Sequence, residues 1–239
     1  MAILITKDLC KTYGSGDNAV HALNHVSLTV EEGEFVSIVG TSGSGKSTFL
    51  NLAGGLDKPT SGEVWVRGHD LGKLNDEQLT IFRRRNIGFV FQNFNLIPML
   101  NVYENITFTL EADALRPDKE FLDGIIHALG LEEKRYAMPD QLSGGQQQRV
   151  AIARALATKP ALILADEPTR ALDSKSARML LDSMETMNAE LHATILMVTH
   201  DAFTASYCKR ILFIKDGKIF NELVRGRDSR KEFFDRIIE

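Results

Sequence analysis

The sequence has 239 residues, a formal net charge of −4 and 44% hydrophobic residues, which is enough for a substantial core. Acidic and basic residues are spread along the chain, and this argues against a large basic surface for nucleic acid. No stretch reaches the roughly 18 consecutive apolar residues of a membrane helix, so we expect any membrane role to come through a partner.

The first third of the chain contains short segments in which polar and apolar residues alternate. Glycine-rich turns separate these segments, which is typical of antiparallel strands, and we expect strands within residues 3–14, 21–34 and 62–71. Tyr13 stands near the end of the first segment, before a glycine-rich loop. Its ring could stack on a nucleotide base or simply pack on the sheet.

The segment GTSGSGKST (40–48) follows the apolar run FVSIVG (35–40) and precedes a helical pattern at 47–54. It fits the phosphate-loop pattern G-x-x-x-x-G-K-[ST], in which backbone N–H groups and a helix N-terminus surround phosphate oxygens. Lys46 would reach the β- and γ-phosphates, and Ser47 would offer its hydroxyl to Mg²⁺. A glycine-rich turn without a ligand is the alternative. The residues expected to bind nucleotide here are Gly40, Thr41, Ser42, Gly43, Ser44, Gly45, Lys46, Ser47 and Thr48.

Further apolar runs without alternation occur at 87–91, 161–166, 194–199 and 211–216. They are rich in β-branched and aromatic residues, a composition typical of strands covered on both faces in a parallel sheet. Helical patterns lie at 120–130, 147–158 and 175–190, and a polar helical insert is expected over about 94–141. The KDGK sequence (215–218) predicts a hairpin turn. The alternation of strands and helices predicts a layered α/β fold.

Four polar side chains stand at the carboxyl ends of predicted strands, where ligands of open α/β sheets bind. Asp166 and Glu167 end the run LILADE; the first could hold Mg²⁺ and the second could deprotonate an attacking water. Gln92 could place its carbonyl near the metal or the water. His200 could donate a hydrogen bond to a γ-phosphate. Taken alone, each could also be an ordinary polar residue at a strand end.

The segment LSGGQQQR (142–149) places a serine and two glycines where the helix at 147–158 must begin. Together with the phosphate loop, Gln92, LILADE and His200, it resembles the ATP-binding cassette family over essentially the whole chain. The resemblance implies a P-loop NTPase (RecA-like) core with a parallel sheet, an N-terminal antiparallel β subdomain and an inserted helical subdomain at about 94–158. It also implies a single nucleotide-binding domain over 1–239.

The resemblance implies that two copies pack head to tail over two nucleotides. The turn that would serve the other copy's nucleotide consists of Ser143, Gly144, Gly145 and Gln146. By the same resemblance, Tyr13 stacks on adenine and Gln92 senses the nucleotide. Glu167 is the general base and His200 contacts the γ-phosphate, so that Lys46, Gln92, Glu167 and His200 form the expected catalytic set. ATP and Mg²⁺ are the implied ligands, with Ser47, Gln92 and Asp166 around the metal.

Two segments indicate a subgroup. GGLDKPTSGEVWVRGHDL and RRRNIGFVFQNFNLIPMLNVYENI look like cassettes that serve macrolide export, lipoprotein release and bacitracin-type peptide-antibiotic resistance. The resemblance therefore implies an ATP-hydrolysing subunit on the cytoplasmic side of the cell membrane that drives a separate permease, for antimicrobial peptide export or resistance. The alternative is a regulatory ATPase of the cell-division type, which signals through a membrane partner without transport.

One residue departs from that subgroup, and one apolar segment permits two interpretations. Arg170 stands where the subgroup has a small residue, and at the dimer seam this cation could clash, pair with phosphate or an acid, or be harmless. An apolar patch follows Gln92, either as packing for the helical insert or as a groove for a short helix of the membrane partner. Its residues are Phe94, Leu96, Ile97, Met99 and Leu100.

Overall fold

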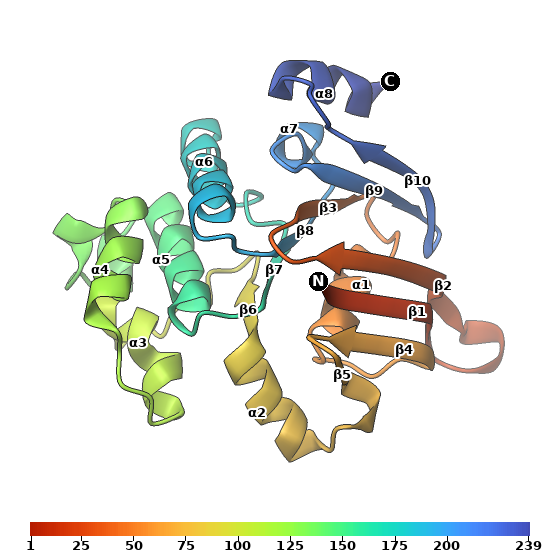
Figure 1. Ribbon diagram of the computed structural model, residues 1–239, viewed down its shortest axis with the longest axis horizontal. Helices are drawn as coiled ribbons and strands as arrows, with labels where there is room; N and C mark the ends of the chain where they lie inside the picture. Colours follow the sequence, from red (N-terminus) through yellow and green to blue (C-terminus); the bar gives the residue numbers. More distant parts are fainter.

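The computed structural model describes residues 1–239, apart from the side chain of Asp17. Two β-sheets form its framework, and Figure 1 shows a group of helices beside them. The larger sheet has six strands in the order β10-β9-β3-β8-β7-β6. Neighbouring strands are parallel except for the antiparallel hairpin of β9 and β10. These strands are β3 (Phe35–Val39), β6 (Ile87–Val90), β7 (Leu162–Asp166), β8 (Ile195–Thr199), β9 (Arg210–Lys215) and β10 (Lys218–Val224).

The larger sheet is apolar because both of its faces are covered. Along β7, Leu162 and Leu164 belong to one core cluster, and the alternate residues Ile163 and Ala165 belong to another. The first cluster packs the antiparallel sheet and α1 against the central strands, and the second packs the helices of the opposite face. This burial confirms the parallel strands predicted from runs without alternation. Strand β10 is the antiparallel exception, because the predicted turn at 215–218 reverses the chain.

The smaller sheet is antiparallel, with the order β2-β1-β4-β5. It consists of β1 (Ala2–Tyr13), β2 (Val20–Glu31), β4 (Ser61–Val66) and β5 (His69–Asp70). The predicted N-terminal strands are thus confirmed, and the last of them is divided by a turn at Arg67 and Gly68, both with positive φ. The α/β fold class with an antiparallel N-terminal part is confirmed.

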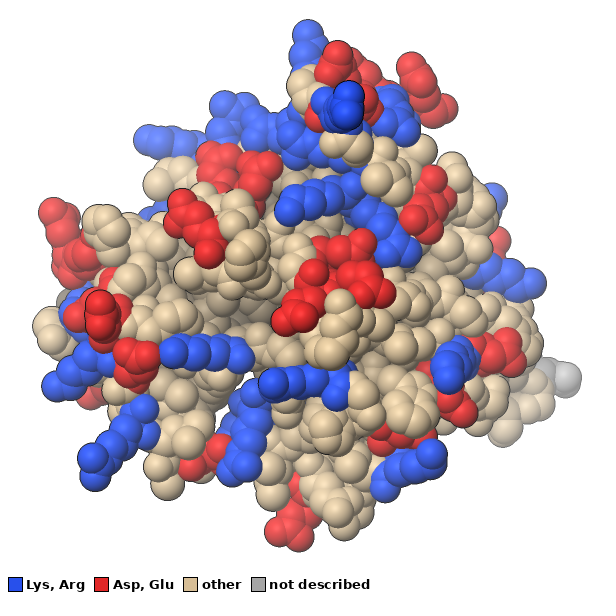
Figure 2. Space-filling model, viewed as in Figure 1, with Lys and Arg blue, Asp and Glu red and all other residues tan. Residues whose placement is uncertain are grey.

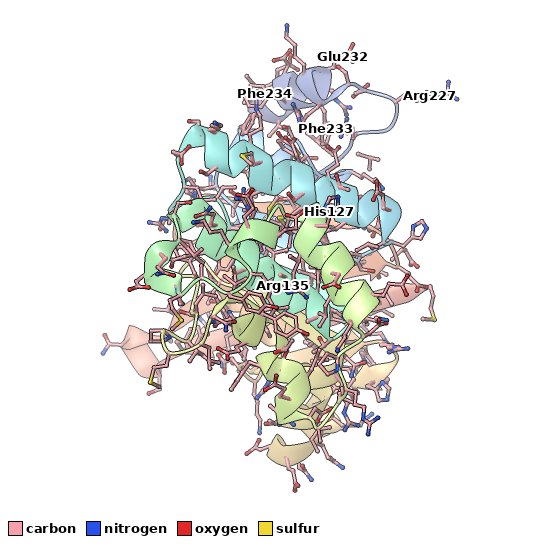
Figure 3. The ribbon with its side chains drawn as sticks, turned by 90° about the vertical axis from the view of Figure 1, so that its left-hand side faces the viewer. His127, Arg135, Arg227, Glu232, Phe233 and Phe234 are labelled. Carbon is pink, nitrogen blue, oxygen red and sulfur yellow. The ribbon has the colours of Figure 1, made fainter. Side chains whose placement is uncertain are left out.

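Eight α-helices complete the fold. They are α1 (Lys46–Ala53), α2 (Asp76–Asn86), α3 (Val102–Ala112), α4 (Lys119–Ala128), α5 (Gly144–Ala157), α6 (Ser174–Glu190), α7 (Ala202–Ala205) and α8 (Arg230–Ile238). The sequence did not predict α2, a short polar helix that buries only Leu79 and Phe82. Helix α8 is an outer element: Figure 3 shows it across the top of the molecule, and Phe233 anchors it against Ala205 and Ile211.

Helices α3, α4 and α5 lie together at one side of the sheets (Figure 1). A charged contact joins this group to α2: Arg84 and Arg85 bind the carboxylate of Asp113 at 2.9 and 2.7 Å. Arg83 donates to the carbonyl oxygen of Gly55 at 2.7 Å, so all three arginines of the run at 83–85 bind protein groups. In the described part of the chain, no helix is long and apolar enough to span a bilayer. Figure 2 shows both signs of charge interspersed on the viewed face.

Candidate functional site

A large cavity opens at the carboxyl ends of the parallel strands, with a volume of about 1150 Å³. It brings together residues predicted from five separate segments of the chain. The predicted residues that line it are Tyr13, Gly40, Thr41, Ser42, Gly43, Gly45, Lys46, Ser47, Thr48, Gln92, Asp166, Glu167 and His200. Ser44 is buried beneath the loop and does not line the cavity. One pocket of this size can hold a nucleotide.

The loop at 40–48 wraps around the N-terminus of α1 because its glycines allow backbone conformations that other residues avoid. Gly45, the N-cap, has φ +105°, and a Cβ there would lie 2.3 Å from the carbonyl oxygen of Ala22. Lys46 folds over the loop and donates hydrogen bonds to the carbonyl oxygens of Gly40 and Thr41 at 2.8 and 2.7 Å. Burial lowers the pKa of Lys46, and the nearby carboxylates of Glu167 and Asp166 oppose that shift. The glycine-rich loop, the helix N-terminus and the lysine suit a phosphate chain.

Two carboxylates stand beside this loop at the end of β7. The Ser47 hydroxyl donates to Asp166 Oδ1 at 3.1 Å, and burial raises the pKa of Asp166. Glu167 is only 8% exposed and has φ +46°, a conformation rare for residues with a side chain. Strain of this kind clusters at functional sites. His200 Nδ1 lies 2.8 Å from both carboxylate oxygens of Glu167, so the two residues form a pair above the phosphate loop.

The oxygen donors near Ser47 fit Mg²⁺. They are one hydroxyl, one carboxylate and the amide oxygen of Gln92, which are hard ligands. The described side chains offer no cluster of three acidic, histidine or cysteine groups for a metal. Mg²⁺ is commonly held by one or two carboxylates together with substrate phosphates and water, and this site could supply the protein's share.

Arg170 enters the same cavity from the turn that follows Glu167. Its Nη1 donates a 3.4 Å hydrogen bond to Gln92 Oε1, and its backbone N–H donates to the carbonyl oxygen of Glu167. The residue that departs from the subgroup's pattern thus lines the candidate site.

Sequence reasoning missed several residues around the cavity. The hydroxyl of Tyr13 donates to Asp57 Oδ2 at 2.9 Å, and Lys11 lies over the tyrosine ring. The hairpin turn at Asp216 and Gly217 lines the cavity, and the Gly217 N–H donates to the Ser44 carbonyl. The KDGK turn signal was visible in the sequence, but nothing in it indicated contact with the phosphate loop.

The predicted turn at 143–146 does not line this cavity. Ser143 caps α5 by accepting from the Gln146 N–H, and the Gln146 side chain accepts from the Ser143 N–H in return. Gly144 faces the segment that follows Arg170: an added Cβ would lie 3.8 Å from Leu172. This chain therefore carries its two candidate phosphate-binding helix starts in different places.

Comparisons with known proteins agree with this geometry. A family model described as ABC transporter matches residues 23–170. The chain is 45% identical to the ABC transporter ATP-binding protein YxdL of Bacillus subtilis strain 168, over 99% of this chain and 92% of that protein. It is 43% identical to the bacitracin export ATP-binding protein BceA of Halalkalibacterium halodurans, over 100% and 95%.

Solved structures show the same arrangement. A dimeric post-hydrolysis state of the ATP-binding cassette MJ0796, bound to ADP and Pi, matches with a TM-score of 0.83 and 45% identity. The match covers 93% of this chain and 98% of that one. The structure of CbiO1 from Clostridium perfringens, part of the transporter complex CbiONQ, also gives a TM-score of 0.83, at 28% identity. It covers 99% of this chain and 92% of that one.

Proposed function

The chain belongs to the ABC transporter family as an ATP-binding ATPase subunit, and from this premise we propose that it binds Mg–ATP in the cavity of the phosphate loop and uses hydrolysis to drive a separate membrane permease. One observation supports this most directly: Lys46, the Ser47–Asp166 contact and the Glu167–His200 pair share one cavity. We also propose that residues 1–239 form one nucleotide-binding domain, with an inserted helical part at about 94–158.

The geometry suggests how the residues divide the chemistry. Lys46 and the loop amides would hold the β- and γ-phosphates. Ser47, Asp166 and Gln92 would hold Mg²⁺, which neutralises phosphate charge when it is bound. Glu167 would accept a proton from the attacking water, and His200 would orient both Glu167 and the γ-phosphate. Positioning and charge stabilisation of this kind supply most of the catalysis in phosphoryl transfer.

In one chain, the turn at 143–146 does not line the phosphate-loop cavity. We propose that a second copy covers the γ-phosphate position with its own turn at 143–146, whose serine cap and helix N-terminus form an anion site. Two findings support this. The turn lies outside the cavity of its own chain, and the related cassette MJ0796 has been solved as a dimer.

A second cavity, of about 420 Å³, supports contact with the permease. Its walls are mostly apolar and come from β6, α2, α3 and α5, with Arg83 and Arg84 at one side. Of the apolar patch predicted after Gln92, only Ile97 lines this groove; Leu96 packs on the core and Met99 is 82% exposed. We propose that a short cytoplasmic helix of the permease lies in the groove.

The relatives support an antimicrobial peptide as the substrate class. BceA of Halalkalibacterium halodurans is named for bacitracin export, and the chain matches nearly its full length. We propose that the chain works on the cytoplasmic face of the membrane and drives export of, or resistance to, peptides of this kind. The test is bacitracin sensitivity of a strain that lacks the gene. Unchanged sensitivity to bacitracin and to other peptide antibiotics, with a defect in division instead, would favour the regulatory alternative.

The central experiment replaces the proposed base. Glu167→Gln should keep ATP binding but lower kcat by at least about a hundredfold, because a general base contributes that much. With Mg–ATP, the variant should also accumulate as a dimer, measured by size-exclusion chromatography. Glu190→Gln, at the exposed end of α6, is the control and should hydrolyse ATP at the parental rate. Parental turnover in Glu167→Gln would remove the assignment of the base.

A further inference from the structure

Tyr13 is held from outside the cavity by two charged residues. Its hydroxyl donates to Asp57 Oδ2 at 2.9 Å, and Lys11 Nζ donates to Asp57 Oδ1 at 2.7 Å. The carboxylate of Asp57 therefore accepts hydrogen bonds from both Tyr13 and Lys11. Without these bonds, an aromatic ring that is 41% exposed at a strand end would be free to adopt several rotamers.

Lys11 also covers one face of the ring. Its ammonium lies 4.8 Å from the ring centroid, and its side chain is only 12% exposed. Lys11 does not line the cavity, whereas Tyr13 does. The ammonium thus makes a cation–π contact from a residue outside the cavity lining, while Tyr13 itself belongs to that lining.

The carboxylate itself is well anchored. Asp57 follows α1, the helix that begins in the phosphate loop, and its N–H donates to the carbonyl oxygen of Asn51 within that helix. Burial alone would raise the pKa of Asp57, but hydrogen bonds from Lys11 and Tyr13 hold it below its usual value. The acceptor therefore stays charged through the physiological range.

Hydrogen bonds join the loop at 57–60 to β1, the strand that carries Tyr13. The Thr12 N–H donates to Thr60 Oγ1 at 2.9 Å, and the Thr60 N–H donates to the Cys10 carbonyl at 2.9 Å. Lys11 Nζ also donates to the carbonyl of Lys58 at 2.7 Å. These bonds connect β1 to the segment that follows α1. They therefore fix the distance between the Tyr13 ring and the phosphate loop, from which α1 begins.

We propose that Asp57 and Lys11 are positioning residues that hold Tyr13 as a preformed stacking platform for the nucleobase, at a set distance from the phosphate loop. The inference rests on the proposed binding of a nucleoside triphosphate. Ordering the ring in advance removes part of the entropy cost of binding. Loss of either residue should therefore weaken recognition of the base and leave recognition of the phosphates unchanged.

The test compares ATP with inorganic tripolyphosphate, which has the phosphate chain but no base. In Asp57→Ala, Asp57→Asn and Lys11→Met, the Kd for ATP should rise about five- to tenfold, the effect of losing one or two hydrogen bonds. The Kd for tripolyphosphate should stay within about twofold of the parental value. KM for ATP should rise in parallel, with kcat at saturation unchanged, because the chemistry at Glu167 is not touched.

Two further variants sharpen the comparison. Tyr13→Phe removes the hydroxyl but keeps the ring. Tyr13→Phe and Asp57→Ala break the same hydrogen bond, so their effects should not add. The double variant should therefore bind ATP no more than about twofold more weakly than the worse single variant. Lys7→Met is the matched control. Lys7 lies 5.5 Å from the Trp65 ring centroid and near Glu63 on the same sheet, away from the cavity, and its loss should change neither Kd.

The possible results distinguish failure of the stacking platform from failure of the proposed function. If the parental chain binds tripolyphosphate and the variants keep parental ATP affinity, the platform is overturned and the phosphate site stands. If both ligands weaken equally in Asp57→Asn and Lys11→Met, the residues act on the general fold and the inference also fails. If the parental chain binds neither ligand, the proposed function fails, and the platform fails with it.

Discussion

Arg170 is the one residue of the candidate site that departs from the pattern of the subgroup. Its guanidinium reaches the cavity and donates to Gln92 Oε1 at 3.4 Å. In addition to burial, its positive charge contributes to lowering the pKa of Lys46. In the sequence, a clash, a pairing and a harmless substitution were all open for this residue. The structure shows no clash within the chain and a hydrogen bond with the proposed metal-side amide. In the proposed site, the bond from Arg170 would compete with Mg²⁺ for Gln92 Oε1.

Arg170→Gly should change the rate of ATP hydrolysis more than the affinity for ATP. Because the variant frees Gln92 from a bond of about 1 kcal/mol, kcat should rise about fivefold, while the Kd for ATP stays within about twofold. The measurements are steady-state ATPase assays and equilibrium ATP binding. Arg170→Ala separates loss of the cation from added backbone freedom. Equal rates in the parental and glycine forms would show that the cation is harmless.

The two adjacent glycines at the start of α5 have different surroundings. A Cβ at Gly145 would lie 2.8 Å from Cβ and Oγ of Ser176 on α6, whereas at Gly144 the nearest atom would be Phe94 Cζ at 3.5 Å. Gly145 therefore lets the N-terminal ends of α5 and α6 pack closely. At Gly144, an added Cβ would make only ordinary van der Waals contacts.

Gly145→Ala should lower the free energy of unfolding by about 1–3 kcal/mol, because the added methyl group forces the two helices apart. Gly144→Ala is its matched control and should keep or slightly increase stability, since alanine favours the helix. Thermal unfolding of the two variants without nucleotide measures both effects. A stable Gly145→Ala protein together with an unstable Gly144→Ala protein would contradict the packing described here.

The groove of about 420 Å³ is made by parts of the chain that are far apart in sequence, from Leu56 just after α1 to Thr158 after α5. Apolar side chains remain exposed around it: Leu56 is 45% exposed and Phe108 on α3 is also 45% exposed. The groove adjoins β6, whose carboxyl end leads to Gln92. A helix held in it could therefore transmit movement between the permease and the nucleotide site.

Phe108→Asp should abolish permease-dependent stimulation of ATP hydrolysis in a reconstituted complex, by at least about tenfold, because it places a charge on an apolar contact. ATP binding to the isolated chain should remain at the parental value. Tyr136→Asp is the control, because Tyr136 is 74% exposed but does not line the groove. Normal coupling by Phe108→Asp would place the permease contact elsewhere on the molecule.

Much of the candidate site could be predicted because its parts are local. The phosphate loop is a continuous segment, and Gln92, Asp166 and His200 each follow an apolar run whose end must reach one edge of a parallel sheet. The prediction missed α2, because a short helix with only two buried residues gives little apolar periodicity. It also missed Asp57, because the bond from Tyr13 to this carboxylate spans 44 residues and leaves no local pattern.

The order of strands and helices, the phosphate loop and the acidic strand end are properties of short segments, and the sequence by itself determined them through backbone preference and patterned burial. Only the tertiary structure decided which distant side chains meet. Examples are the Glu167–His200 pair, the contact of Arg170 with Gln92, the hydrogen bond from Tyr13 to Asp57 and the walls of the groove. The reason is physical. These contacts depend on how sheets and helices pack, and packing joins residues at separations over which sequence periodicity carries no information.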